Sequence, residues 1–148
     1  MSERITLFAE VLLPLPLPKL YTYRVPYEWN ELVMPGLRVA VPFGIKKVYS
    51  GIVWSLSETG PEGYQAHYIT EILDDEVLVD PSQRDFWEWM SRYYMAHLGD
   101  VMQGALPAGF RVQSQTKITL HPEFEPDEIA VIDEKENQIL GLLIQQKS

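Results

Sequence analysis

The stretch LRVAVPFGIKKVYSGIVWSL, residues 37–56, decides the fold that the sequence predicts. Its two ends, 37–41 and 48–56, are rich in β-branched and aromatic residues, which favour strands. Between them lie Pro42-Phe43-Gly44 and a short basic tip, which supply the turn of a hairpin. Gly51 interrupts the second strand, and a glycine there indicates a bulge or a close approach of another backbone.

Three more stretches outside this hairpin have the character of strands. Residues 4–12 place Ile5, Leu7, Ala9 and Val11 on one face, with the period of two that marks a half-buried strand. Residues 20–25 and 67–73 are the other two. Five short strands separated by turn residues predict a small antiparallel β-barrel or curled sheet over residues 4–75.

Prolines and glycines define the connections between these strands. LPLPLPK (13–19) alternates leucine with proline, which fixes φ and has no amide hydrogen. We therefore expect an extended, polyproline-like segment at a sheet edge rather than a helix. Pro35-Gly36 fits a type II turn, in which glycine takes the position of positive φ.

The periodicity changes to that of helices after residue 80. Asp80-Pro81-Ser82 predicts a helix start, because a capping side chain precedes proline at the first helical position. We expect the buried face of this helix to carry Phe86, Met90, Tyr93 and His97, with Trp89 beside them. Gly99 fits a helix C-cap, and residues 100–106 predict a second short helix closed by Pro107. The predicted fold is thus mainly β with an α cap over 80–106, an α+β class.

Residues 113–148 differ in character from the rest. Their first half is polar and spaced by prolines, as in a linker. Asp133 and Glu136 resemble a capping box, which would open an amphipathic helix with little nearby to pack against. We therefore predict one domain over 1–112, followed by a linker and the truncated start of a further domain over 113–148.

Composition narrows the classes of protein to which the chain can belong. It has 148 residues, no cysteine and a net charge of −9, so disulfide frameworks and thiolate metal sites are excluded. Residues 1–50 nevertheless carry a net charge of +2, and residues 51–148 carry −11. Glu10 and three prolines interrupt the apolar N-terminal run, so we expect neither a signal peptide nor a membrane partner, and a cytoplasmic location.

The sequence contains no catalytic motif that we can identify. Phosphate-cradling glycine loops and the common hydrolase and metalloprotease motifs are missing. The three histidines, His67, His97 and His121, are far apart in sequence, which disfavours a metal site. The carboxylates at 74–76 could serve acid–base chemistry, although a solvated run of charge is the better explanation, because adjacent residues in a turn point apart. We expect no enzyme activity and no cofactor for this chain.

One cluster of residue types does suggest a ligand. Tyr21, Tyr23 and Phe43 lie close in sequence to basic residues, and aromatic rings beside cations form stacking platforms for single-stranded nucleic acid. The alternative is that these rings are simply core residues of the sheet. Composition and spacing leave both possibilities open.

Three motifs carry a resemblance to a known family. They are LPLPLPKLYTYRVP (13–26), PGLRVAVPFG (35–44) with the following GIV (51–53), and SRYYMAHLGDVMQGALP (91–107). In this order and spacing the chain resembles the N-terminal DNA-binding domain of primosomal protein N′, the PriA replication-restart helicase. By the same resemblance, the start of a domain after residue 113 would be that of a winged helix.

The resemblance implies a function and a site. In the family, this domain holds the 3′ end of the nascent leading strand at a stalled replication fork, with the terminal nucleotide in a small pocket. Carried over by position, the DNA 3′-end-binding residues are Tyr21, Thr22, Tyr23, Gly44 and His67, with the nearby cations Lys19, Lys46 and Lys47. The family often has an acidic residue at the position of Thr22 and a lysine at that of His67.

The resemblance also implies a larger parent protein. That protein would be an ATP-dependent 3′–5′ DNA helicase acting in primosome assembly, with ATP, magnesium and zinc bound outside this chain. Its partners would include other replication-restart proteins and single-strand-binding proteins. Two alternatives stay open: an acidic protein-interaction domain that docks helicase lobes or replication partners, and a small hydrolase that uses the carboxylates at 74–76.

Overall fold

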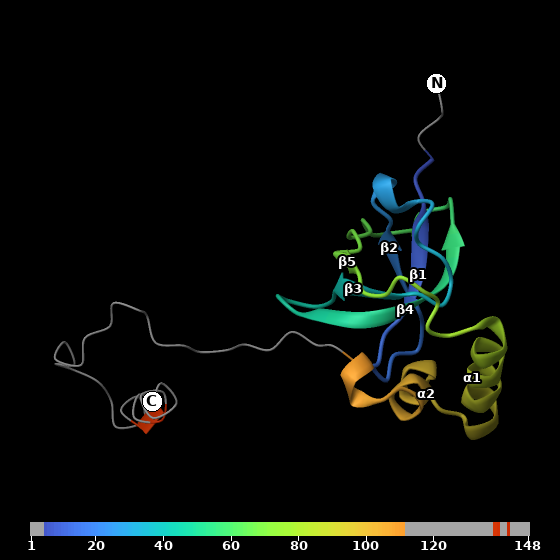
Figure 1. Ribbon diagram of the computed structural model, residues 1–148, viewed down its shortest axis with the longest axis vertical. Helices are drawn as coiled ribbons and strands as arrows, with labels where there is room; N and C mark the ends of the chain where they lie inside the picture. The colour runs from blue at the N-terminus through green and yellow to red at the C-terminus, as the bar shows by residue number, and fades with distance from the viewer. Residues whose placement is uncertain (1–4, 112–137, 140–141, 143–148) are drawn as a thin grey trace. The chain divides into compact units, whose positions relative to one another are not determined.

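The computed structural model describes residues 5–111, 138–139 and 142. The chain divides into two units, Met1–Ser114 and Gln115–Ser148, and the named elements all belong to the first (Figure 1). These elements are β1 (Phe8–Leu12), β2 (Tyr21–Arg24), the 3-10 helix η1 (Tyr27–Trp29), β3 (Arg38–Pro42), β4 (Val48–Ser57), β5 (Glu71–Ile72), α1 (Pro81–Tyr94), α2 (Leu98–Ala105) and η2 (Ala108–Phe110). The linker and winged-helix start predicted over 113–148 lie outside the described residues, apart from 138–139 and 142.

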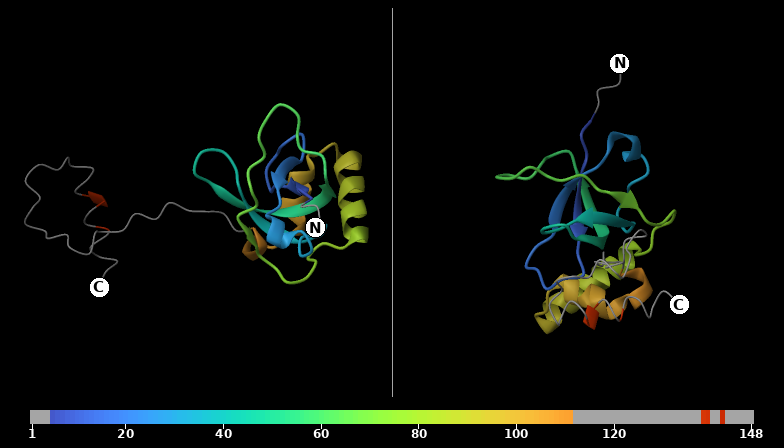
Figure 2. Two further views of the ribbon diagram at one scale, coloured as in Figure 1. Left: turned by 90° about the horizontal axis from the view of Figure 1, so that it is seen from above. Right: turned by 90° about the vertical axis from the view of Figure 1, so that its left-hand side faces the viewer.

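The five strands form one sheet in the order β2-β1-β4-β3-β5, in which every neighbouring pair is antiparallel. The sheet curls, and α1 and α2 lie side by side at one end of it (Figures 1 and 2). An antiparallel sheet with two helices confirms the predicted α+β class. No helix in the described part of the chain is long and apolar enough to span a membrane.

The fifth strand is shorter than the sequence predicts. Only Glu71–Ile72 pairs regularly with β3, whereas a strand was expected over 67–73. The preceding residues bond to β2 instead: the Arg24 amide donates to the His67 carbonyl at 2.7 Å, and the Ile69 amide donates to the Arg24 carbonyl at 3.0 Å. This segment therefore joins the two ends of the curled sheet, and that crossing position breaks its regular pairing with β3.

Strand β4 is buried on both faces and separates two apolar cores. Tyr49 and Val53 belong to the first core, which fills the curl of the sheet. Ile52 and Trp54 belong to the second core, which lies under the helices. The close approach expected at Gly51 is confirmed, since a Cβ there would lie 2.4 Å from Val11 Cγ1 and 2.9 Å from the Leu12 carbonyl oxygen.

The Pro35-Gly36 turn has the predicted geometry. Gly36 has a φ of +94°, and the Leu37 amide donates to the Met34 carbonyl at 3.2 Å. Both features match a type II turn. A side chain at Gly36 would also collide with the Val79 carbonyl, 2.2 Å from the Cβ position, so the chain that enters α1 crosses directly over this turn.

The proline-rich segment differs from the polyproline-like edge that we expected. The Leu15 amide donates to the Leu13 carbonyl and the Leu17 amide to the Leu15 carbonyl, each at 2.8 Å, which makes two consecutive γ-turns. Polyproline chain has no such internal bonds. The segment also contacts α2, where a Cβ on Gly99 would lie only 2.0 Å from the Leu15 carbonyl oxygen. Gly99 is thus a contact glycine inside α2 and not the predicted C-cap.

The start of α1 is confirmed in detail. The Asp80 carboxylate accepts from the Gln83 amide at 2.9 Å, and the Gln83 side chain accepts from the Asp80 amide at 2.9 Å. This reciprocal pair is a capping box, with proline at the first helical position. At the other end Met95, with a φ of +50°, takes the left-handed capping position, and His97 is the N-cap residue of α2.

The predicted buried face of α1 is wrong. Trp87 is the buried residue at 5% exposure, whereas Phe86, Trp89 and Tyr93 are exposed by 50–65%. Met90 is only half-buried, and His97 lies beyond the helix.

Hydrogen bonds explain which face of α1 meets the sheet. The Trp87 ring stacks on Trp54 of β4, with centroids 6.3 Å apart. Two polar residues of α1 also form hydrogen bonds with Trp54: Arg84 donates to the Trp54 carbonyl, and the Trp54 indole donates to Glu88, both at 2.9 Å. Polar side chains that bond to Trp54 therefore occupy the inner face, and the aromatic residues outside stack on one another, with Trp89 and Tyr93 centroids 5.0 Å apart.

Two tryptophans on α1 provide a matched test of this orientation. Trp87→Ala should lower the free energy of unfolding by about 3–5 kcal/mol, because it empties a core position. Trp89→Ala should cost less than about 1.5 kcal/mol, since only exposed ring stacking is lost. Urea unfolding followed by circular dichroism measures both. Equal losses, or a larger loss for Trp89→Ala, would contradict the orientation described.

Candidate nucleic-acid interface

A cavity of about 340 Å³ opens between β2, the end of β3 and the loop that leads to β5. Its lining residues are Lys19, Tyr21, Thr22, Tyr23, Pro42, Phe43, Gly44, Tyr64 and His67. The structure thus brings together six of the eight residues named from the sequence. The other two, Lys46 and Lys47, are exposed on the β3–β4 hairpin loop and do not line the cavity.

Aromatic rings form one wall of the cavity. The edge of Tyr21 meets Phe43, with centroids 5.0 Å apart and planes at 77°. Phe43 in turn meets Tyr49 of the first core at 6.1 Å, so the wall is anchored in the protein interior. The Lys19 ammonium lies 5.6 Å from the centre of the Tyr21 ring, which gives this wall a cation. The rings are therefore neither free platforms nor wholly core, because Tyr21 and Phe43 are each half-buried.

Tyr23 is a buried residue of the cavity lining. It is 4% exposed, and its hydroxyl donates to the Pro42 carbonyl at 2.8 Å, which ties β2 to the end of β3. Burial raises the pKa of the Tyr23 phenol well above its ordinary value, and the neighbouring phenols of Tyr64 and Tyr21 raise it further. Tyr23 therefore remains neutral and keeps donating its hydrogen bond in alkaline solution.

The outer edge of β2 presents backbone hydrogen-bonding groups to the cavity. Arg24 directs its N–H and C=O away from β1, toward the 67–69 segment. Thr22 precedes it by two residues and so points the same way. Its amide donates to the Tyr64 hydroxyl at 3.4 Å, a long bond that a ligand atom could replace. The strand edge thus offers a donor and an acceptor that do not depend on side-chain identity.

Gly44 and His67 complete the rim. Gly44 has a φ of +71°, and no heavy atom lies within 4 Å of the position a Cβ would take. This glycine is required by its backbone conformation, and the space beside it is open. His67 is exposed, and its carbonyl accepts from the Arg24 amide, which fixes its backbone beside the cavity.

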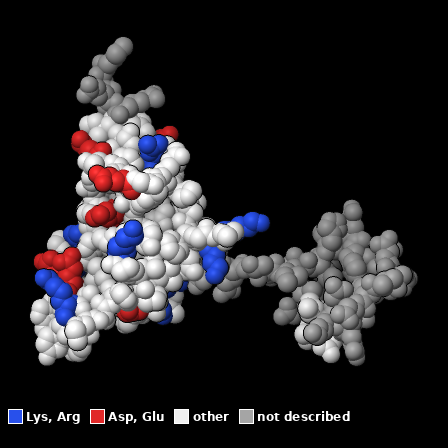
Figure 3. Space-filling model, turned by 180° about the vertical axis from the view of Figure 1, so that it is seen from behind, with Lys and Arg blue, Asp and Glu red and all other residues white. Residues whose placement is uncertain are grey.

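Among the residues that the structure describes, no carboxylate lines the cavity. Its basic side chains are Lys19 and His67, which suit an anionic or neutral ligand. On the face that Figure 3 shows, the basic side chains of the described residues are spread over the surface and form no large patch. In the residues that the structure describes, no three His, Asp or Glu side chains lie close enough to hold a metal ion.

Sequence comparison adds the observation that decides the family. Residues 10–107 match the family model of the PriA 3′ DNA-binding domain. This chain belongs to that family. The membership supports a DNA-binding role in replication restart.

Individual relatives agree with this assignment. The replication restart protein PriA of Haemophilus influenzae is 35% identical over 101 residues, which cover 68% of this chain and 14% of the relative. PriA of Synechocystis is 32% identical over 126 residues, covering 82% of this chain and 15% of the relative. PriA of Treponema pallidum is 29% identical over 104 residues, with 67% and 16% covered. The chain thus spans about one seventh of the length of these relatives.

Two lining residues of this PriA-type domain, Pro42 and Tyr64, were missed by sequence reasoning as site residues. Pro42 was assigned only to the turn, although it lies close to Gly44, whereas Phe43 was named as a possible stacking ring but not among the 3′-end-binding residues. Tyr64 lies in the loop between β4 and β5, 47% exposed, and nothing in its spacing from Tyr21 or Gly44 links it to them. An aromatic residue directly after Gly63 in an otherwise polar loop is the only signal that could have pointed to it.

The carboxylates considered for acid–base chemistry lie outside this cavity. Asp74 accepts two hydrogen bonds from Arg38, at 2.8 and 3.0 Å. Arg38 also donates to the Phe110 carbonyl at 3.1 Å. Asp74 therefore acts as the partner of a structural arginine, and the pair of free carboxylates that a hydrolase would need is not formed with it.

The raised pKa of Tyr23 predicts how stability depends on pH. A phenol whose folded-state pKa exceeds its unfolded value adds to the free energy of unfolding. This contribution is complete below about pH 10 and is lost as the pH rises above that. Tyr23→Phe should cost about 0.5–1.5 kcal/mol at neutral pH through the lost hydrogen bond, and should show a shallower loss of stability between pH 9 and pH 11. Urea unfolding across this range measures both. Parallel pH profiles for the two proteins would contradict the burial of this phenol.

Proposed function

We propose that this domain holds the 3′-terminal nucleotide of a DNA strand in the Tyr21–Phe43 cavity. The observation that carries the proposal is the convergence in one cavity of three separate stretches, which contribute Tyr21 and Thr22, Gly44, and His67. The 3′ DNA-binding family that matches residues 10–107 supports the same ligand. The strand bound in the cell would be the nascent leading strand at a stalled fork.

The terminal base would be held by stacking and by backbone groups. A base stacked on Tyr21 gains about 1–3 kcal/mol by the usual alanine measurements. The Thr22 N–H and C=O at the strand edge can pair with one acceptor and one donor on the base. Because every base offers both kinds of group, this arrangement favours binding of any terminal nucleotide over reading of its sequence.

The cavity would select the 3′ end of a strand because its walls surround the terminal nucleotide. The Gly44 turn and Tyr64 line the cavity on either side of its opening, and we expect a bound terminal nucleotide to leave little room beyond its sugar. A 3′-phosphate, or a strand that continues past the 3′ oxygen, would add atoms that collide with the cavity walls. The Thr22 hydroxyl and the His67 imidazole are the side-chain groups best placed to meet the 3′-hydroxyl.

The rest of the function would belong to a longer polypeptide. The relatives are replication restart proteins of which this chain matches only 14–16%. We propose that the chain is the non-catalytic, end-reading part of such an ATP-dependent helicase, which acts in the cytoplasm with other replication proteins. ATP, magnesium and zinc would be bound by the remaining domains.

Short single strands that differ only at the 3′ end test the proposal. The unmodified chain should bind a 3′-hydroxyl strand at least tenfold more tightly than a 3′-phosphate strand, whereas a 5′-phosphate should have no effect. Gly44→Val should abolish this preference, because it fills the cavity, and Tyr21→Ala should weaken binding by about 1–3 kcal/mol. Fluorescence anisotropy measures the affinities.

Control variants separate the site from the fold. Gly44→Ala carries similar positive-φ strain with less volume, so it should retain more of the preference than Gly44→Val. Thr22→Asp should be tolerated, since an acid is common at this position in the family. Circular dichroism shows whether each variant folds. Equal affinity of the folded, unmodified chain for both 3′ ends would mean that the cavity is not an end-binding site.

The scarcity of cations predicts a shallow salt dependence. Lys19 and the hairpin lysines allow roughly one to three phosphate contacts, so log K should fall with log salt with a slope of about −0.7 to −2. Anisotropy titrations between 50 and 300 mM NaCl measure the slope. A slope near −4, as for six contacts on a single strand, would reveal a basic surface that this structure does not account for.

A further inference from the structure

We propose that a second cavity, at the other end of β3, binds an arginine side chain presented by a basic, apolar segment of a partner protein. This cavity has a volume of about 340 Å³, within the range of ligand sites. Trp29, Leu32 and Ile72 supply its apolar surface, and Glu71 and Asp75 supply carboxylates. The proposal is independent of the DNA site.

The two cavities share no lining residue. Leu37, directly before β3, lines this one, and Pro42, the last residue of β3, lines the DNA cavity. Leu37 and Pro42 are five positions apart along the chain, or about 16 Å in an extended strand. A partner bound at one end of β3 therefore leaves the other end accessible.

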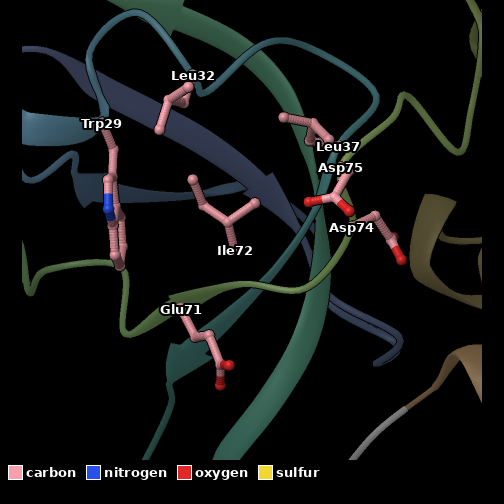
Figure 4. A pocket seen from close by; sticks show the side chains of 7 residues that line it. All are labelled: Trp29, Leu32, Leu37, Glu71, Ile72, Asp74 and Asp75. Atoms are coloured by element: carbon pink, nitrogen blue, oxygen red, sulfur yellow. The ribbon is translucent and has the colours of Figure 1, made fainter.

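The apolar surface of the second cavity is anchored in the protein interior. Trp29 and Ile72 pack against the first core, which fixes their position. Leu32 is 56% exposed, a large fraction for an apolar side chain. Figure 4 shows Trp29 and Asp75 on opposite sides of the cavity, with Ile72 between them and Leu32 above. A ligand here would touch an indole face and a carboxylate together.

The charge of the cavity specifies a cation. Asp74 is already paired with Arg38, but neither Glu71 nor Asp75 belongs to an ion pair within residues 5–111. None of the lining residues is basic. Carboxylates on an apolar wall repel nucleic acid phosphates, so the surface fits a protein partner and not a second DNA contact.

Among cationic side chains, arginine fits best. Its planar guanidinium stacks on aromatic faces and forks onto carboxylates, whereas lysine is a compact and strongly hydrated charge. The three methylenes of its stem can lie along Ile72 and Leu32 beside Trp29, while the guanidinium meets Asp75 (Figure 4). An apolar neighbour of the arginine in the partner segment would cover the exposed part of Leu32.

Peptide titration of the whole 148-residue chain tests this inference. The probes are acetyl-Leu-Arg-Leu-amide and its lysine and glutamine counterparts. The Trp29 indole signal in ¹H–¹⁵N spectra, assigned with Trp29→Phe, should shift saturably with the arginine peptide. The lysine peptide should bind at least threefold more weakly, and the glutamine peptide should give no saturable shift.

Variants of the carboxylates complete the test. Glu71→Gln with Asp75→Asn should weaken arginine-peptide binding at least fivefold, whereas Glu58→Gln with Glu62→Gln, in the loop after β4, should leave it unchanged. Both double variants should bind 3′-hydroxyl DNA as the unmodified chain does, so failure here is distinguishable from failure of the DNA proposal. No saturable shift, equal binding of the glutamine or lysine peptide, or a Trp29 shift caused by DNA would overturn the proposal.

Discussion

The burial of β4 on both faces is the constraint on which the rest of the structure depends. A strand buried on two sides needs a layer of apolar side chains on each, and here one layer is the curl of the sheet and the other is the helical cap. Because Gly51 has no side chain, β1 approaches β4 closely, with Val11 in the first core and Leu12 in the second. Trp54 extends the strand into the second core, where it meets Trp87 and fixes α1.

The DNA cavity follows from the way in which the curl closes. The bonds between Arg24 and the 67–69 segment bring the chain before β5 against β2, which places His67 beside Tyr21 and Thr22. The hydroxyl of Tyr23 then ties β2 to Pro42, so that the Gly44 turn stands across the same opening. The walls of the cavity are thus held by backbone bonds and a buried phenol, and the side chains at its rim are free to meet a ligand.

The two cavities at the ends of β3 differ in the charge of the residues that line them. The DNA cavity is lined by Lys19 and His67 with no carboxylate, and the second cavity is lined by carboxylates with no basic residue. A net charge of −9 is therefore compatible with a DNA-binding family, because no carboxylate of the described residues lines the DNA cavity. The same separation keeps phosphates away from the surface that we assign to a protein partner.

The sequence by itself determined what depends on neighbours in the chain. The period of two in the strands, the helix start at Asp80 and the type II turn at Gly36 follow from local chemistry, and all three were predicted. Motif resemblance also named six residues of the cavity. Only the tertiary structure decided the inward face of α1, the role of Gly99 and the place of Tyr64 in the site. The reason is that each depends on a partner far away in sequence: the hydrogen bonds of Trp54 turn polar residues of α1 inward, the Leu15 carbonyl requires a glycine in α2, and the edge of β2 positions Tyr64.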